Sequence, residues 1–68
     1  MLTVLQIGDK VRDTRKRKLL TQDQLADKAG VGVNTIIRIE RNQVEPQGRT
    51  IRKLAAALGV APSDLLED

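Results

Sequence analysis

Two short helical patterns joined by a very short turn, within residues 22–41, constrain the fold of this chain more than any other feature. The first pattern follows Thr21, which forms a capping box with Gln24: the threonine oxygen accepts a hydrogen bond from the backbone, and the glutamine reaches back to the cap. Gly30 suits a left-handed helix end, and the second pattern begins at Val33. Because so short a turn prevents the two helices from lying antiparallel, we expect their axes to cross steeply.

The rest of the chain is also predicted to be helical, because apolar residues recur at intervals of three and four rather than two. The expected helices cover residues 5–18, 22–29, 33–41, about 49–58 and 62–66, and a loop containing Pro46 covers residues 42–48. Their spacing predicts buried positions at Ile7, Val11, Leu25, Ala26, Ala29, Ile36, Ile39, Ile51, Leu54, Ala55 and Leu58. Thr14 is expected on the same face of the first helix as Ile7 and Val11. We therefore predict an all-α fold of five helices in a single compact domain over residues 1–68, with its core at about residues 6–66.

Composition excludes several classes of function. The chain contains no Cys and no His, which removes disulfides, zinc and iron–sulfur sites, and every thiol or imidazole mechanism. Asp23 and Asp27 fit an exposed helix face, and Ser63, the one serine, has no base beside it. We expect no enzyme, no metal and no cofactor. The absence of Phe, Tyr and Trp also removes the platforms that stack single-stranded bases, so a nucleic-acid partner would be a duplex.

The charge distribution points to an anionic partner. Residues 1–63 hold twelve basic and six acidic residues, a net charge of +6, because Asp64, Glu67 and Asp68 lie in the last five positions. No apolar run approaches the roughly 20 residues that a membrane helix needs, and the first seven residues do not resemble a secretory signal. We expect a cytoplasmic protein without a membrane partner.

Specific residues within the crossing segment fit a known pattern. Within the two crossing helices and their turn, the matching residues are Gln22, Ala26, Gly30, Val31 and Ile36. The residues that flank them and also match are Ile7-Gly8, Val11-Arg12, Ile39-Glu40-Arg41, Pro46 and Leu58-Gly59-Val60. In these residues the chain resembles the phage repressor and Cro-type (Xre-like) helix-turn-helix family, over about residues 6–66. The alternative is an unrelated five-helix domain, in which residues such as Ala26 and Ile36 would be ordinary core.

The resemblance implies a compact five-helix repressor-like DNA-binding domain with its helix-turn-helix at residues 22–41. It also implies sequence-specific binding of double-stranded DNA by a transcriptional regulator, in most cases a repressor, encoded by a bacterium or phage and associated with the nucleoid. An alternative is an antitoxin-like or adaptor protein whose main partner is another protein. That alternative calls for an extended partner-binding segment, and the chain has none beyond its acidic last residues.

The outer face of the helix over residues 33–41 holds the candidate base-reading residues. At about 100° per residue, Ile36, Ile39 and Glu40 fall on one side and Asn34, Ile37, Arg38 and Arg41 on the other. Arginine can bind guanine and asparagine can bind adenine through two hydrogen bonds. An outward isoleucine can cover a thymine methyl, although a single exposed isoleucine is equally common without a role. The resemblance implies base reading at Val33, Asn34, Ile37 and Arg38.

Residues around that helix are candidates for phosphate contacts, which position a protein on DNA without specifying sequence. They are Gln22, at the positive end of its helix, and Arg41, Asn42, Gln43 and Arg49 on the other flank. For the arginines the alternative is plain surface charge. Asn42 stands where the family usually has glycine, and asparagine is the next best residue for a left-handed turn. Leu19 likewise replaces a common glycine at the end of the first helix.

Two charged residues are expected to have a structural role. Arg15 lies one turn after Val11 and Glu40 one turn after Ile36, so both flank buried faces and neither can be left unpaired. The simplest solution is an ion pair between them, and the resemblance supports it.

One small module offers little area for affinity, so we expect a homodimer that reads two half-sites. The apolar candidates for its contact surface are Ala56, Ala57, Val60, Leu65 and Leu66. An equally good interpretation is that the leucines close the core.

Overall fold

The computed structural model describes residues 7–66, and within that range the regular secondary structure is all α-helix. The helices are α1 (Ile7–Arg17), α2 (Gln22–Ala29), α3 (Val33–Glu40), α4 (Gly48–Leu58) and α5 (Pro62–Leu66). The predicted all-α fold with five helices is confirmed. Helices α1 and α3 each end one residue earlier than expected, and α4 begins one residue earlier, at Gly48. The predicted start of the first helix, at Leu5 and Gln6, lies outside the described residues.

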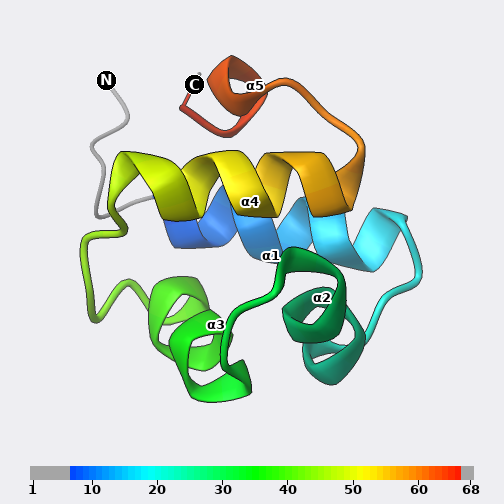
Figure 1. Ribbon diagram of the computed structural model, residues 1–68, viewed down its shortest axis with the longest axis horizontal. Coiled ribbons are helices and arrows are strands. Elements are labelled where there is room, and N and C mark those ends of the chain that lie inside the picture. Colours follow the sequence, from blue (N-terminus) through cyan, green and yellow to red (C-terminus); the bar gives the residue numbers. More distant parts are fainter. Residues whose placement is uncertain (1–6, 67–68) are drawn as a thin grey trace.

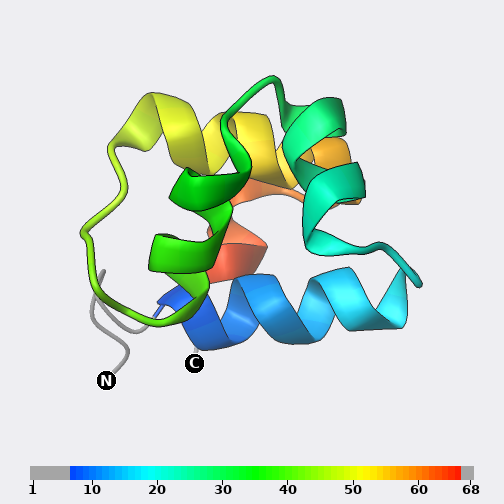
Figure 2. The same ribbon diagram turned by 90° about the horizontal axis from the view of Figure 1, so that it is seen from below.

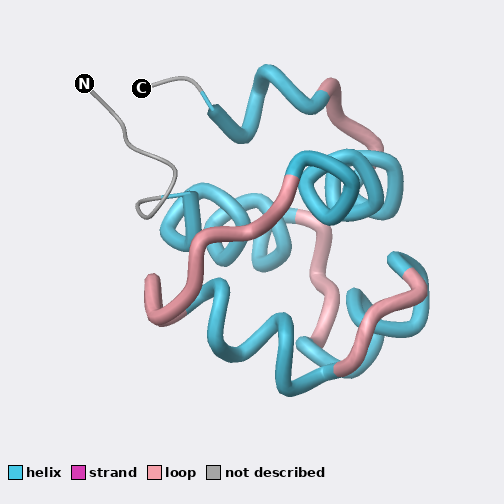
Figure 3. Tube along the Cα trace, turned by 60° about the vertical axis from the view of Figure 1, so that its left-hand side comes forward, coloured by secondary structure: helices cyan, strands magenta, loops and turns pink. Residues whose placement is uncertain are grey.

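Helices α1 and α4 form a middle layer, with α2 and α3 on one side of it and α5 on the other (Figure 1). Seen from the side of α2 and α3, α4 and α1 run along opposite edges of the molecule (Figure 2). The connections are short, and the longest of them joins α3 to α4 along one flank (Figure 3). Helices α2 and α3 pack against each other and are joined by the short turn at residues 30–32.

The core is built from aliphatic side chains at helical spacing. Every helix contributes at least one residue to a single cluster, which contains Ile7, Val11, Leu25, Ala26, Ala29, Ile36, Ile39, Ile51, Leu54, Ala55, Leu58 and Leu65. The eleven aliphatic positions predicted from the spacing are buried, and Leu65 is the addition. Thr14, predicted on the same face as Ile7 and Val11, is only half-buried. With 1% of its surface exposed, Leu65 closes the core from α5 and cannot belong to a dimer contact surface. Leu66 is 44% exposed.

Four of the helices end in the same way. After each of α1 to α4, a residue with positive φ is followed by one whose N–H donates to the carbonyl oxygen five residues earlier. Gly30 (φ 69°) and Gly59 (φ 71°) fill this position after α2 and α4. Asn42 (φ 57°) fills it after α3, as predicted, and Leu19 (φ 59°) fills it after α1. The chain therefore places side chains at two positions where glycine is the unstrained choice.

The helix starts differ more than the ends. Thr21 accepts from the Gln24 N–H at 3.0 Å, and the Gln24 side chain accepts from the Thr21 N–H at 2.8 Å, so the predicted capping box is present. Gly32 gives α3 no side-chain cap, also as predicted. Before α5, alanine at position 61 is a poor N-cap residue, but the Asp64 carboxylate accepts a hydrogen bond from the Ala61 N–H at 3.1 Å.

Candidate nucleic-acid interface

The turn between α2 and α3 sets the direction of α3. Gly30 ends α2 in the left-handed conformation, and the Val31 N–H donates to the carbonyl oxygen of Ala26 at 3.1 Å. Leu25 of α2 and Ile36 of α3 are both fully buried in the shared core, which fixes one face of α3 against the molecule. The opposite face of α3 is left open to solvent.

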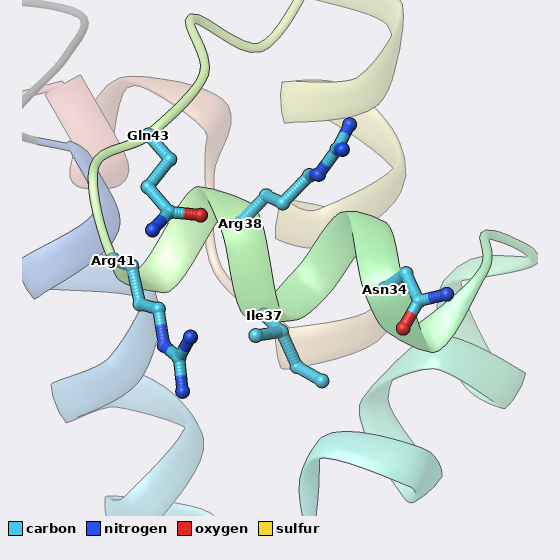
Figure 4. A pocket seen from close by; sticks show the side chains of 5 residues that line it. All are labelled: Asn34, Ile37, Arg38, Arg41 and Gln43. Carbon is cyan, nitrogen blue, oxygen red and sulfur yellow. The ribbon is translucent and has the colours of Figure 1, made fainter.

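That outer face bears a shallow, open recess of about 490 Å³. Its lining residues are Asn34, Ile37, Arg38, Arg41 and Gln43. Figure 4 shows their side chains around the outer side of α3, with Asn34 near the α2 end and Arg41 and Gln43 near the other end. Three of the four predicted base-reading residues and two of the five predicted phosphate residues are therefore brought together in one place.

Ile37 differs from the other half-buried aliphatic residues of the chain. Leu20, Val31, Val33, Val44, Ala57 and Val60 pack against the core, whereas Ile37 does not belong to that group and lines the recess instead. Its polar neighbours give the recess one apolar spot between an amide and two guanidinium groups. Such a surface fits the edge of a base pair, where a methyl group lies beside hydrogen-bonding atoms.

The recess is electropositive. Arg38 and Arg41 are exposed, and among residues 7–66 neither forms an ion pair with an acidic side chain. The one acidic residue of α3, Glu40, faces the interior with 4% of its surface exposed. In the described part of the chain, the two guanidinium groups therefore have no acidic partner that would compete with an anionic ligand.

Glu40 and Arg15 form a buried ion pair that connects α3 to α1. The Arg15 Nε donates to Glu40 Oε2 at 2.7 Å and its Nη2 donates to Oε1 at 3.0 Å, the two-bond geometry in which arginine binds a carboxylate most strongly. The Arg15 Nη1 also donates to the Leu20 carbonyl oxygen at 2.8 Å. Only 11% of the Arg15 side chain is exposed, so these bonds satisfy a charge that solvent barely reaches.

Gln22 and Asn42, both predicted to bind phosphate, use their side chains within the fold. The Gln22 amide donates to Glu40 Oε1 at 3.2 Å and joins the ion pair. The Asn42 amide oxygen accepts from the Gly8 N–H at 3.1 Å, and its nitrogen donates to Asp9 Oδ1 at 3.2 Å. Both side chains are half-buried, and neither lines the recess. A phosphate contact by either residue stays a prediction.

The two remaining predicted residues lie outside the recess. Val33 is the first residue of α3 and packs partly against the core, so only part of its surface is available. Arg49 is exposed in the first turn of α4. The base-reading role of Val33 and the phosphate role of Arg49 stay predictions.

Sequence reasoning missed a close contact between α1 and α3. A Cβ atom on Gly8 would collide with the carbonyl oxygen of Ile39 and would lie 2.6 Å from Asn42 Oδ1. Gly8 therefore allows the start of α1 to pack directly on the end of α3. The sequence holds a signal for this contact, a glycine inside a helix, but nothing in the sequence shows which segment lies against it.

The fold and the exposed face of α3 define a helix-turn-helix domain. The helix-turn-helix family model matches residues 11–65, and the chain belongs to this family. It is 37% identical to the cryptic phage CTXphi transcriptional repressor RstR of Vibrio cholerae over 61 residues. This match covers 90% of this chain and 55% of that protein. It is 34% identical over 62 residues to the immunity repressor protein of Bacillus phage phi105, covering 91% of this chain and 43% of that protein.

Solved structures agree with this membership. The restriction-modification controller protein C.AhdI from Aeromonas hydrophila matches with a TM-score of 0.87 and 32% identity, over 91% of this chain and 94% of that one. The P22 c2 repressor protein, solved in complex with synthetic operator 9T, matches with a TM-score of 0.83 and 33% identity, over 90% and 92% of the two chains. The chain spans about half the length of the two repressors that it matches in sequence.

The described part of the chain has no helix that is long and apolar enough to cross a membrane.

Proposed function

We propose that this chain binds double-stranded DNA in a sequence-specific manner and acts as a transcriptional regulator, most simply as a repressor. The observation that carries this proposal is the outer face of α3, where two arginines that have no acidic partner within residues 7–66 surround one open recess together with an asparagine and an isoleucine. Membership of the helix-turn-helix family and the repressor relatives support it. The phage and bacterial origin of those relatives supports an intracellular site of action on bacterial or phage DNA.

In this proposal α3 lies in the major groove. Arg38 binds guanine and Asn34 binds adenine, each through two hydrogen bonds, and Ile37 covers a thymine methyl between them. Val33, at the start of α3, contributes a smaller apolar contact. Arg41 and Gln43 at the end of α3, with Arg49 at the start of α4, bind phosphates and hold the helix in register. The peptide N–H groups at the start of α2, around Gln22, can serve as additional phosphate donors, because the first N–H groups of a helix have no partner within it.

We also propose a homodimer, because two copies related by twofold symmetry would read two half-sites about 34 Å apart. Of the residues predicted for such a contact, those that are not buried in the core are Ala56, Ala57, Val60 and Leu66. The first two line a groove of about 310 Å³ together with Lys18, Leu20, Lys28, Leu58 and Gly59. This groove lies beside the C-terminal end of α4, away from the outer face of α3.

The proposal is tested by selecting duplexes from a random library with the 68-residue chain at physiological salt. We expect enrichment of an inverted repeat whose half-sites are one helical turn apart. The same selection with Arg38→Ala and with Asn34→Ala should lose preference at different base pairs of each half-site. Enrichment of no sequence would contradict sequence-specific binding, and enrichment of a single unrepeated site would contradict the symmetric dimer.

A further inference from the structure

Asn42 connects the end of α3 to the start of α1. Its side-chain oxygen accepts from the Gly8 N–H at 3.1 Å, and its side-chain nitrogen donates to the Asp9 carboxylate at 3.2 Å. The first N–H groups of a helix have no partner within that helix, so Asn42 satisfies a donor that α1 itself cannot. One amide thus uses both of its functional groups on the same turn of α1.

The two helices are in direct contact at this point. Gly8 is buried, and a side chain there would collide with the Ile39 carbonyl oxygen. Close backbone packing and two side-chain hydrogen bonds together fix the end of α3 relative to α1. The Arg15–Glu40 ion pair, at the other end of α1, makes the second connection between the same helices.

The residues on either side of Asn42 line the recess. Arg41 precedes it and Gln43 follows it, and both are exposed. The left-handed backbone of Asn42 returns the chain so that the Gln43 N–H donates to the Arg38 carbonyl oxygen at 2.9 Å. The directions in which Arg41 and Gln43 leave the backbone therefore depend on how Asn42 is held.

A left-handed backbone alone does not explain asparagine at this position. Glycine adopts the same φ without strain and fills the equivalent position after α2 and α4. Leu19 adopts it after α1 with a side chain that is 89% exposed. Among these four positions, Asn42 alone uses a side chain to bind another helix within residues 7–66.

We propose that Asn42 is a positioning residue for DNA binding: through Gly8 and Asp9 it anchors the end of α3 to α1 and thereby orients Arg41 and Gln43 toward the phosphate backbone. This inference rests on the proposed function. It assigns the Asn42 side chain to the fold and not to the DNA, in contrast to a direct phosphate contact by that amide.

The test compares Asn42→Gly with the wild-type chain on the duplex that the wild type selects from a random library. Glycine keeps the left-handed turn and removes both hydrogen bonds. We expect a several-fold loss of affinity, because Arg41 and Gln43 would then have to be ordered when DNA binds instead of beforehand, with a cooperative thermal unfolding transition retained. Leu19→Gly is the matched control, because it makes the same change of backbone preference at the end of α1, and we expect no change in affinity.

A double-mutant cycle separates positioning from direct contact. If Asn42 orients Arg41, then Arg41→Ala should cost several-fold less affinity in the Asn42→Gly background than in the wild type. A swapped pair, Asn42→Asp with Asp9→Asn, keeps the net charge, keeps an acceptor for the Gly8 N–H and reverses the bond between the two side chains. It should recover most of the affinity that Asn42→Asp alone loses. Amide hydrogen exchange at Gly8 should accelerate in Asn42→Gly and stay slow in the swapped pair.

Wild-type affinity for Asn42→Gly would overturn this inference alone, and so would equal costs of Arg41→Ala in both backgrounds. A wild-type chain that selects no duplex would overturn the proposed function and this inference with it. Slow exchange at Gly8 in Asn42→Gly would overturn the anchor itself, independently of any DNA measurement.

Discussion

Both faces of α3 carry polar side chains, but those on the inner face are buried and hydrogen-bonded whereas those on the outer face are exposed and have no partner within residues 7–66. On the inner face, the Glu40 carboxylate is 4% exposed, and both of its oxygens accept hydrogen bonds from Arg15 or Gln22. On the outer face, Asn34 and Arg38 are exposed, and neither side chain bonds to another group in the described range. Whether a polar residue contributes to stability or to recognition therefore depends on the partners that it has within the fold, and not on its residue type.

The largest expected effect comes from removing the inner carboxylate. Glu40→Ala leaves the Arg15 guanidinium buried without its counter-charge and leaves Gln22 without an acceptor. Breaking a buried pair in this way should lower the free energy of unfolding by about 3–5 kcal/mol, measured by urea denaturation. Arg15→Met combined with Glu40→Leu serves as the control, since a packed apolar pair should recover much of the loss. A loss below about 1 kcal/mol, typical of surface ion pairs, would show that solvent reaches the pair.

Adjacent isoleucines give a matched test of the two faces. Ile36 is fully buried and Ile37 lines the recess. Ile36→Ala should reduce the free energy of unfolding by about 2–5 kcal/mol because it creates a cavity. Ile37→Ala should cost about 1 kcal/mol or less in unfolding, yet it should weaken binding to the selected duplex by removing the contact with a thymine methyl.

Both variants are measured for unfolding in urea and for binding to the same duplex. If Ile37→Ala destabilises the fold as much as Ile36→Ala, then Ile37 belongs to the core and the outer face is narrower than we propose.

Local patterns in the sequence predict most of the fold. Apolar spacing identifies the buried face of each helix, and the capping box at Thr21 and the glycine at Gly30 mark the start and end of α2. These signals involve residues within a few positions of each other, where the geometry of the helix itself decides the outcome. The outer face of α3 is predicted in the same way, because it is the complement of the buried face.

Contacts between segments that are distant in the sequence could not be predicted from local patterns. Asn42 is predicted to take a left-handed turn, but its bonds to Gly8 and Asp9 depend on α1 lying against the end of α3. Gln22 is foreseen at the start of α2, whereas its bond to Glu40 depends on how α2 and α3 cross. The role of Leu65 could not be predicted for the same reason. Whether it closes the core or contacts a second copy depends on how α5 packs against the rest of the chain.

A smaller effect, on DNA binding and specific to one sequence, is expected from removing an arginine on the outer face of α3. Arg38→Ala should weaken binding to the selected duplex by about 1–3 kcal/mol, the cost of losing a two-bond contact with guanine. Binding to a duplex of mixed sequence should change much less, and the free energy of unfolding should be unchanged because Arg38 is exposed. Fluorescence anisotropy with both duplexes checks the first two expectations. Equal losses on both duplexes would mean that Arg38 binds phosphate and does not read a base.

The smallest expected effect is on the salt dependence of DNA binding, and it distinguishes the role of Arg41 from that of Arg38 on the same face of α3. Arg41 lies at the end of α3, where we propose a phosphate contact, so Arg41→Ala should weaken binding to every duplex alike and leave base preference unchanged. Each phosphate contact releases counterions, so the slope of log K against log salt concentration should decrease by about one. Arg38→Ala is the natural control, since a base contact gives sequence-dependent losses. If Arg41→Ala instead changes the preferred bases, the reading surface extends past the end of α3, and Gln43 would then become the next candidate for a base contact.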